Sequence, residues 1–439
     1  SAEICQRYAD KYPNNIVYVS QENAGVSAAR NHGMEYIEGK YVNFLDSDDK
    51  WEPNAYRMIR NFFDESYEHI DLIAGRMKFF EARTDYHPLD FRFLNKQSRI
   101  INILNEESSI QMHVTSCVIK SEVAKKWRFN EEQKYGEDTV YINKIIMDRG
   151  RYGVVTNAVC GYRKRADESS AVQGQRNKKL WYIGTPEQFY GELIRFSQEK
   201  YGCVIRYLQH ILVYDIQFRV SLDYNHVISK DAFEQYKKQI YQYIQTVDDQ
   251  CIIRARTLGM DEKIRLLKFK NGKLDKEQFK LSDNMVMYEN YSMINITDRG
   301  ATLHVNFISI KNDELVLEGC LRNWLFDFCP DLKLKYTSNE KEYYPVEFNS
   351  YDIGKKDTIE GTEWLFKFYR VRIPLDGKKQ RIFPVLELPN GAECRMRMVF
   401  TKFMPIAYGN AGASYFSGKY FVRQYNNWLE VSVPKSILT

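Results

Sequence analysis

The sequence lacks the features that mark membrane-spanning, exported or disulfide-stabilised proteins. None of its apolar runs approaches the roughly 18 residues that a membrane-spanning helix needs. Ser1–Asp10 has neither an apolar core nor a small-residue cleavage pattern, so we expect no export signal in this sequence. The eight cysteines include no Cys-x-x-Cys pair and no histidine at ligand spacing. We therefore expect reduced thiols in a cytoplasmic protein, rather than a disulfide framework or a zinc site.

The sequence also has no large excess of positive or negative charge. Lys and Arg number 63 and Asp and Glu number 58, which leaves a net charge of +5. This excess is too small and too dispersed to indicate nucleic-acid binding, although it is compatible with contact to anionic lipid or phosphate. The chain is 44% hydrophobic and 28% charged, which is typical of a folded globular protein. Its length predicts about three structural units.

Residues 1–180 alternate short apolar segments with amphipathic ones. We expect strands at Ile16–Val19 and Tyr41–Leu45 and a third strand starting at Leu72, with helices between them. Strand–helix–strand units with short links predict an α/β domain with a mostly parallel sheet. Ligands of such sheets bind beyond the carboxyl ends of the strands, which directs attention to the residues after Leu45.

Two further regions differ in their hydrophobic period. Residues 181–285 carry apolar residues three or four positions apart, which predicts a helical region. From residue 286 the period changes to two, and Asn390–Gly391 is a hairpin signal between two alternating runs. Leu303, Val305 and Phe307 share one apolar phase, which slips by one residue to Ile308 and Ile310, and a β-bulge after Phe307 would absorb the slip. We therefore predict a β-sandwich over residues 286–439.

The strongest chemical signal is the run Asp46-Ser47-Asp48-Asp49, which follows the predicted strand ending at Leu45. Three carboxylates this close repel one another, and a bound divalent cation would relieve the repulsion. Oxygen ligands suit Mg²⁺ or Mn²⁺, which usually also bind substrate phosphate. The alternative is an Asp-rich turn that caps a helix starting near Pro53, and the run by itself does not decide between the two.

A second segment, Asn23 to Gly33, lies one predicted strand earlier. Gly25 and the small residues after it would let a ligand approach the N–H groups at the start of a helix. The same residue types also serve close packing of a helix on a sheet, so this segment alone is a weak signal.

Two more segments, Gly136-Glu137-Asp138 and Tyr162–Arg165 with Ser169, complete a set of four. In order and spacing, residues 1–175 resemble the family-2 glycosyltransferases of the GT-A fold. The resemblance implies a Rossmann-like, inverting enzyme that uses Mn²⁺ or Mg²⁺. It would move a hexosyl or N-acetylhexosaminyl group from a nucleotide sugar, with UDP as the expected carrier, to a hydroxyl of a cell-surface glycan. The remainder of the chain resembles accessory regions of enzymes in bacterial capsule and teichoic-acid assembly.

The resemblance also implies roles for single residues. Asp48 and Asp46 match the metal-binding Asp-x-Asp, with Asp46 nearer the ribose. Asp138 matches the general base that activates the acceptor hydroxyl, although from its position before an apolar helix it could instead be an N-cap. The residues that would bind the nucleotide sugar are Asn23, Gly25, Arg30, Asp46, Glu137, Arg163, Arg165 and Ser169. Of these, Arg163 and Arg165 would stabilise the leaving diphosphate, or they belong to a solvated surface run.

The start of the sequence departs from the family. The family begins with a strand and an Asp-Asp-Gly-Ser-like turn, whereas Ser1–Ile4 resembles the helix after that turn, so we expect an N-terminally incomplete GT-A domain. A second hypothesis is a non-catalytic glycan-binding or scaffold protein that retains the motifs. The family's lipid-linked or polymer acceptors imply peripheral contact with the inner face of the cell membrane. Self-association through residues 286–439 is a further prediction.

Overall fold

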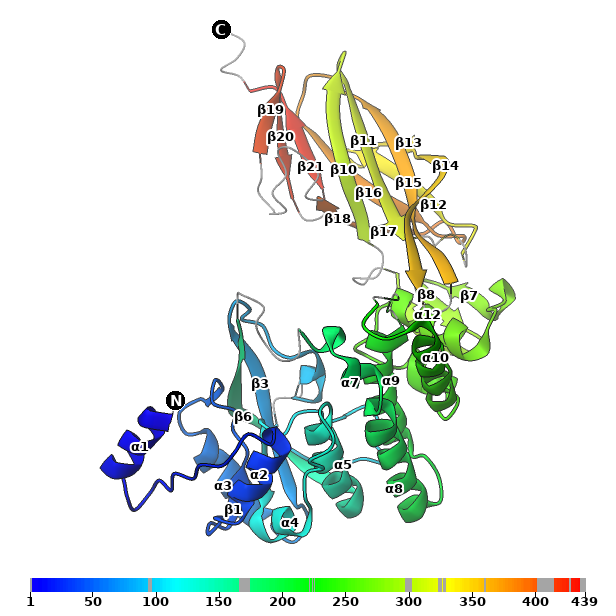
Figure 1. Cartoon of the computed structure of the whole chain (residues 1–439). Helices are drawn as coiled ribbons and strands as arrows, with labels where there is room; N and C mark the ends of the chain where they lie inside the picture. The colour runs from blue at the N-terminus through cyan, green and yellow to red at the C-terminus, as the bar shows by residue number, and fades with distance from the viewer. Residues whose placement is uncertain are drawn as a thin grey trace. The chain divides into compact units, whose positions relative to one another are not determined.

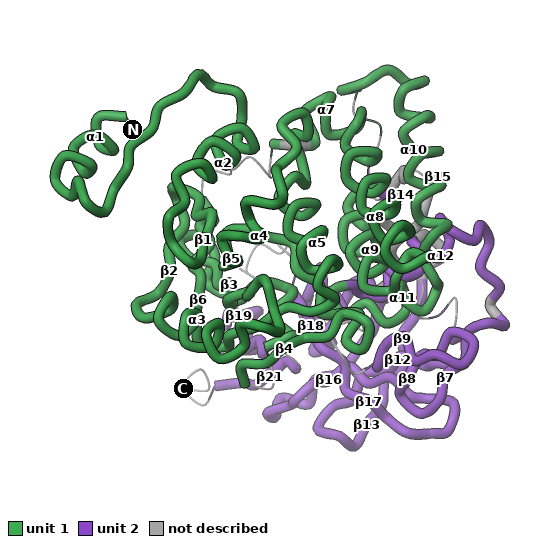
Figure 2. The backbone as a smooth tube through the Cα atoms, turned by 90° about the horizontal axis from the view of Figure 1, so that it is seen from below, with its two compact units in different colours: residues 1–219, 224–257 green, residues 220–223, 258–439 purple. Residues whose placement is uncertain are grey.

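The structure is a computed structural model that describes residues 2–93, 97–165, 174–220, 222, 224, 226–296, 302–322, 326, 329–358, 361–400, 414–425 and 428–434. The chain divides into two compact units, shown in different colours in Figure 2. The first unit comprises residues 1–219 and 224–257, and the second comprises residues 220–223 and 258–439. The boundary falls inside the predicted helical region 181–285, so these helices are shared between the two units.

The first unit opens with an α/β region, as predicted (Figure 1). Its helices are α1 (Ala2–Lys11), α2 (Val26–Met34), α3 (Ala55–Glu65), η1 (Pro88–Phe93), α4 (Ser121–Lys126) and α5 (Glu137–Arg149). Its strands are β1 (Tyr41–Asn43), β2 (Lys50–Trp51), β3 (Leu72–Glu81), β4 (Arg99–Asn102), β5 (Cys117–Lys120) and β6 (Arg151–Lys164).

Helix α3 shows how apolar residues at helical spacing build the core, although Tyr56, which we expected on this stripe with Ile59 and Phe63, is 48% exposed. Ala55, Ile59 and Phe63 recur every four residues and are at most 1% exposed. They pack against one face of the sheet, in a cluster that includes Ile73 and Val155. Burial of a side chain the size of Ile or Phe contributes roughly 1.5–3 kcal/mol, so this apolar stripe fixes the helix on the sheet.

The strand order of this sheet is β1–β5–β3–β6–β2, with β4 also pairing with β6. Only β3 and β6 pair in parallel, and the other four ladders are antiparallel. The prediction of a mostly parallel sheet is therefore wrong for the described strands. It failed because β5 inserts between β1 and β3 and opposes both of them. As a consequence β1, β3 and β6 still run in one direction.

The predicted strand Ile16–Val19 has no regular secondary structure. Its apolar side chains face solvent, and Val17 is 69% exposed. A short apolar run forms a strand only when a neighbouring strand pairs with it, and in the described part of the chain β5 is the only ladder partner of β1. Helix α1 likewise buries none of its residues.

The helical region follows as predicted. Its helices are η2 (Gln175–Asn177), α7 (Lys179–Tyr182), the π-helix η3 (Glu187–Gly191), α8 (Glu192–Tyr201), α9 (Arg206–Val220), α10 (Lys230–Ile244), α11 (Asp249–Ile253), α12 (Met260–Asn271) and η4 (Lys276–Gln278). The fully buried Arg219 of α9 donates from Nε to Asp215 at 2.6 Å and stacks on Trp181. In the described part of the chain, no helix combines the length and apolarity that crossing a membrane would require.

The second unit is rich in β-structure, as predicted, although the first strand starts seven residues before the predicted boundary. A three-stranded sheet contains β7 (Phe279–Ser282), β8 (Met285–Tyr288) and β9 (Tyr291–Asn295). A five-stranded sheet contains β10 (Thr302–Lys311), β11 (Glu314–Arg322), β14 (Glu347–Thr358), β15 (Gly361–Pro374) and β18 (Arg397–Phe400). A seven-stranded sheet contains β12 (Lys333–Ser338), β13 (Glu342–Pro345), β16 (Gln380–Glu387), β17 (Glu393–Arg395), β19 (Ser414–Ser417), β20 (Tyr420–Gln424) and β21 (Leu429–Ser432).

The five- and seven-stranded sheets meet at a buried pair of tyrosines. Tyr336 of β12 and Tyr369 of β15 are both 0% exposed, and their hydroxyl oxygens are 2.8 Å apart. The hairpin at Asn390–Gly391 joins β16 to β17 as predicted. The predicted bulge is also present, but it precedes Phe307 instead of following it: the register of β10 shifts between Val305 and Phe307, which leaves Phe307 51% exposed.

Candidate active site

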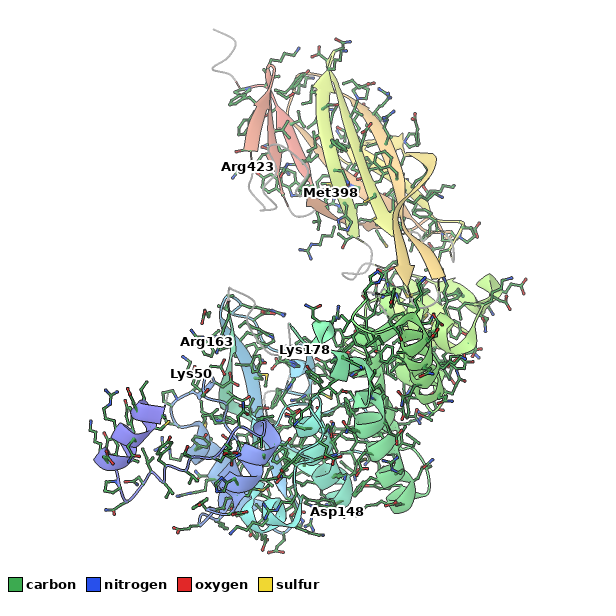
Figure 3. All side chains as sticks on the ribbon, viewed as in Figure 1. Lys50, Asp148, Arg163, Lys178, Met398 and Arg423 are labelled. Carbon is green, nitrogen blue, oxygen red and sulfur yellow. The ribbon has the colours of Figure 1, made fainter. Side chains whose placement is uncertain are left out.

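The sheet topology brings four separate segments to one edge of the first unit. Because β1, β3 and β6 share a direction, their carboxyl ends lie at the same edge, and the amino end of antiparallel β5 joins them. The segments that meet there are residues 44–49, Glu81, residues 113–116 and residues 162–165. Figure 3 shows Lys50 and Arg163 at this end of the sheet and Asp148 at the opposite end of α5.

Arg30 of α2 connects two of the predicted site residues. Its Nη2 donates to Asp46 Oδ1 at 3.3 Å, and its Nη1 donates to Glu137 Oε1 at 3.1 Å. The guanidinium lies over the ring of Phe129, with 5.2 Å to the centroid, and the side chain is 11% exposed. The sequence pattern did not suggest Phe129, whose ring supports the Arg30 guanidinium through a cation–π contact.

The carboxyl groups of this cluster are harder to ionise than usual. Burial raises the pKa of Asp46, and repulsion from Asp138 and Asp48 adds to the effect while Arg30 opposes it. Burial also raises the pKa of Glu137 to about 7, again helped by Asp138 and opposed by Arg30. A single arginine therefore leaves this group of carboxylates short of positive charge.

Asp48 faces a different cation. Its Oδ2 accepts from Arg165 Nη2 at 2.8 Å, and the two side chains are 34% and 38% exposed. An ion pair this exposed contributes at most about 1 kcal/mol. The pair can therefore separate at little cost, so that Asp48 binds a stronger cation and Arg165 binds a stronger anion.

Asp49 was not among the predicted site residues, although it is the third carboxylate of the run. Its Oδ1 accepts from the backbone N–H of Arg163 at 3.0 Å, and its Oδ2 accepts from the Thr115 hydroxyl at 3.2 Å. Burial raises the pKa of Asp49 to about 6, although the hydrogen bonds from these two donors lower it. Asp49 ties the run after β1 to the end of β6 and to the segment before β5. The density of carboxylates in the run was the signal that could have indicated it.

Asp138 is the second residue of α5 and does not cap the helix, so the N-cap alternative is wrong. The N-cap is Gly136, whose φ of 73° lies in the left-handed region that suits glycine. The Asp138 Oδ1 accepts from the Thr139 N–H at 2.8 Å, and its Oδ2 accepts from the Val114 N–H at 3.4 Å. These contacts hold the carboxylate beside the segment that precedes β5. The Asp46–Asp49 run is not a cap either, because α3 starts from Asn54.

The other predicted residues are more scattered. The Asn23 Oδ1 accepts from the Gly25 N–H at 3.2 Å, which forms the turn that starts α2. The Arg163 side chain pairs with Glu81 at the end of β3. Ser169 lies outside the described residues.

Two histidines to which the sequence pattern gave no role lie together near Asp138. His87 Nε2 and His113 Nε2 are 3.2 Å apart, and His87 Nδ1 accepts from the Leu89 N–H. Burial lowers the pKa of His87 to about 2. Burial also lowers the pKa of His113, although the charge of Asp138 opposes this second shift. His87 therefore donates from Nε2 to a neutral His113. Their separation of 26 residues left no local pattern to find.

The donor set suits a hard divalent cation shared with a substrate. Within the described ranges, no three or more His, Cys, Asp or Glu side chains gather in a way that could hold a metal ion. An all-protein cage is therefore not formed there. Mg²⁺ and Mn²⁺ are often bound by one or two carboxylates together with substrate phosphates. The carboxylates of Asp46 and Asp48, which repel each other, offer oxygens of the type that such an ion prefers.

Comparison with known sequences agrees with the motifs. Residues 1–127 match the family described as "Glycosyl transferase family 2", which confirms the resemblance for that segment. Glu137, Asp138, Arg163 and Arg165 lie beyond it. The chain is also similar to two proteins of Bacillus subtilis (strain 168). It is 32% identical to the minor teichoic acid biosynthesis protein GgaB over 322 residues, and 29% identical to the minor teichoic acid biosynthesis protein GgaA over 323 residues.

These matches cover 72% and 73% of this chain, but only 35% of GgaB and 66% of GgaA. The chain thus spans about a third of one relative and about two thirds of the other. Among solved structures, S. aureus TarS aligns with 99% of this chain and 78% of its own, at 16% identity and a TM-score of 0.45. A likeness at that level supports no inference about fold or ligand.

Proposed function

We propose that the chain is a glycosyltransferase acting on a cell-wall glycan, because residues 1–127 match the family described as glycosyl transferase family 2. It would transfer a hexosyl or N-acetylhexosaminyl group from a nucleotide sugar, with UDP as the carrier, to an acceptor hydroxyl. The observation that carries the proposal is the meeting of Arg30, Asp46 and Glu137 beside Asp48 and Asp138 at one edge of the sheet. The names of GgaB and GgaA support an acceptor of the teichoic-acid type.

The proposal assigns the donor diphosphate to the side of the site that holds Asp48 and Arg165. The weak pairing of these two side chains supports this assignment, because phosphate oxygens would attract Arg165 and leave Asp48 free. Asp48, with Asp46, would then hold a Mn²⁺ or Mg²⁺ ion. When bound, such an ion neutralises charge on the departing nucleoside diphosphate.

Asp138 would act as the general base of a single displacement. Its carboxylate takes the proton from the acceptor hydroxyl while that oxygen bonds to the anomeric carbon and the bond to the diphosphate breaks. Attack from the face opposite the leaving group inverts the anomeric centre. Arg30 keeps Glu137 in place next to Asp138, and Arg165 stabilises the charge on the leaving group.

The same proposal includes the fold of each unit and the cellular location of the reaction. A GT-A arrangement of the first unit and a β-sandwich in the second would fit a transferase that carries an accessory region. The reaction would take place in the cytoplasm, at the inner face of the membrane if the acceptor is lipid-linked.

Replacement of Asp138 by Asn tests the assignment of the base. We expect transfer to fall by a factor of about 10²–10⁴, the usual contribution of a positioned base, with donor binding unchanged. The matched control is Asp148→Asn, the same change at the opposite end of α5, where Asp148 pairs with Lys200 (Figure 3). Transfer at the native rate by the Asp138 variant would refute the role.

Replacement of Asp48 by Asn tests the assignment of the metal. We expect a higher KM for the donor, and we expect chelation with EDTA to stop transfer by the native protein until Mn²⁺ or Mg²⁺ is returned. If neither the chain nor its metal-supplemented form hydrolyses any nucleotide sugar, the second hypothesis, a glycan-binding or scaffold protein, replaces the first.

A further inference from the structure

The seven-stranded sheet has two different faces. One face carries core residues and the other carries arginines. In β16, Gln380 and Ile382 are at most 3% exposed and share the side of Tyr336, which contacts the other sheet. Because side chains alternate along a strand, Arg381 and Phe383 lie on the opposite, outward side. The cross-strand partners on neighbouring strands extend this outward face in both directions.

Three aromatic rings form a stack on the outward face. Tyr425 and Trp428 lie parallel, with ring centroids 3.8 Å apart and an interplanar angle of 4°. Phe383 of β16 stacks on Trp428 with centroids 5.8 Å apart. Phe383 is only 6% exposed although it points away from the core, so the stack itself shields it from water.

Each ring of the stack carries an arginine. The guanidinium carbon of Arg395 lies 4.4 Å from the Phe383 centroid, that of Arg381 lies 5.2 Å from Trp428, and that of Arg423 lies 5.3 Å from Tyr425. We call these six residues the arginine–aromatic face. A guanidinium stacked on a ring keeps its edge N–H groups turned outward, where they suit bidentate contact with phosphate. Arg381 and Arg395 are 56% and 53% exposed.

A hollow of about 340 Å³ opens beside this face, lined by Asn339, Glu340, Lys379, Arg381 and Phe383. The turn that forms its rim is fixed to β16. The Asn339 N–H donates to the Arg381 carbonyl at 2.8 Å, and the Arg381 N–H donates to Asn339 Oδ1 at 2.9 Å. The hollow is therefore preformed, and a ligand need not order its rim.

The charge on the face and its hollow is unbalanced. Four cations, Lys379, Arg381, Arg395 and Arg423, stand against the anions Glu340 and Glu430. Glu340 pairs with Arg395, and Glu430 accepts from Lys379 at 2.8 Å. The pair of Arg395 with Glu340 is exposed on both sides and can yield to a ligand anion, and the excess of positive charge favours a negatively charged partner.

From this combination we infer that the arginine–aromatic face binds a phosphodiester-linked glycan or polyol chain. The arginines would take successive phosphates, and the edges of Trp428 and Tyr425 would contact the apolar C–H surfaces of the sugar or polyol units between them. The inference rests on the proposed function for the identity of the chain, which would be the acceptor polymer. The face would hold the polymer while its end is extended.

The test measures binding of a synthetic poly(glycerol phosphate) oligomer to the full chain at low salt. We expect saturable binding that weakens as salt screens the arginines. The double variant Arg381→Gln, Arg395→Gln should bind about 9- to 25-fold more weakly, because each exposed arginine–phosphate contact contributes a factor of about three to five. The matched control is Arg370→Gln, Arg372→Gln, which removes two ion-paired arginines of β15 in the other sheet and should bind like the native chain.

Thermal unfolding of each variant checks its folding. If the double variant does not fold, Arg423→Gln alone provides the same comparison. Equal loss of binding in the control pair would overturn the inference. So would equal or tighter binding to neutral dextran, to inorganic phosphate alone or to phosphatidylglycerol vesicles.

A second readout separates this inference from the proposed function. Hydrolysis of the nucleotide sugar without acceptor should be the same in the native chain and the double variant, whereas the KM for a polymer acceptor rises and the KM for a single-unit acceptor does not. If no nucleotide sugar is turned over, the proposed function fails while the binding experiment still decides the inference. If turnover occurs and the oligomer does not bind, the inference alone fails.

Discussion

Replacement of Glu137 by Gln gives a sharp test of the electrostatics of the site. The Glu137 side chain is 12% exposed, lies next to Asp138 in α5 and has Arg30 as its ion partner. Burial and the neighbouring carboxylate outweigh the arginine and raise its pKa from 4.5 to about 7. Gln keeps an oxygen that can accept a hydrogen bond from Arg30, but its side chain does not ionise in this pH range.

The sign and size of the effect follow from proton linkage. Between the two pKa values the folded protein holds a proton on Glu137 that the unfolded chain has released, so the free energy of unfolding falls as pH rises through this window. At about 1.4 kcal/mol for each pKa unit, a rise from 4.5 to about 7 corresponds to about 3 kcal/mol. The Gln variant does not lose this stability, because its side chain does not ionise. Its unfolding free energy relative to the native chain should therefore rise by about 3 kcal/mol between about pH 4.5 and pH 7.5.

Urea titrations followed by hydrogen exchange in α5 measure this difference, because they report the unfolding of the first unit alone. The control Glu192→Gln should show no such rise between pH 4.5 and pH 7.5, and a change of the opposite sign below about pH 4.5. Burial opposes ionisation of Glu192, but Lys144 and Arg195 together lower its pKa below 4.5, so its carboxylate stabilises the fold above about pH 4.5 and loses this effect as pH falls further. A difference between the Glu137 variant and the native chain that stays constant with pH would refute the reasoning.

Three other changes have defined outcomes. Arg30→Ala leaves two carboxylates without their cation and should lower the unfolding free energy of the first unit by about 3 kcal/mol, measured by urea titration. Asp49→Ala breaks the links to β6 and to Thr115 and should lower kcat/KM about tenfold, with Thr115→Val giving a smaller loss in the same assay. Gly319→Ala would place a Cβ 1.9 Å from the His304 carbonyl oxygen and should cost the second unit at least about 2 kcal/mol, seen as a lower Tm.

Local patterns predicted most elements of the fold but not their pairing. The apolar spacing in α3 and the turn at Asn390–Gly391 depend on neighbours in sequence, so both could be predicted. The direction of β5 could not, because a four-residue strand buried on both sides carries no alternation and its partners are distant in sequence. Ile16–Val19 failed for the converse reason, since its local pattern is that of a strand but none of the described strands pairs with it.

The candidate site shows the same division. The run Asp46–Asp49 was visible because its residues are adjacent in sequence. The partners that give each carboxylate its environment were not, since Arg30 and Glu137 are 107 residues apart and Asp49 and Thr115 are 66 apart. Only the sheet edge brings them together. The spacing of Asp46 and Asp48 likewise did not indicate that each side chain pairs with an arginine of its own, Arg30 for Asp46 and Arg165 for Asp48.

The cost of this arrangement favours a catalytic interpretation over a scaffold. Asp46, Asp49 and Glu137 all have raised pKa values, with burial as the largest cause of each. Burying carboxylates with too few cations lowers stability, and apolar replacements at such sites are often neutral or stabilising. A scaffold would gain nothing from this cost. A site that receives a cation and a nucleoside diphosphate would recover it on binding, and perturbed pKa values of this kind gather where such chemistry takes place.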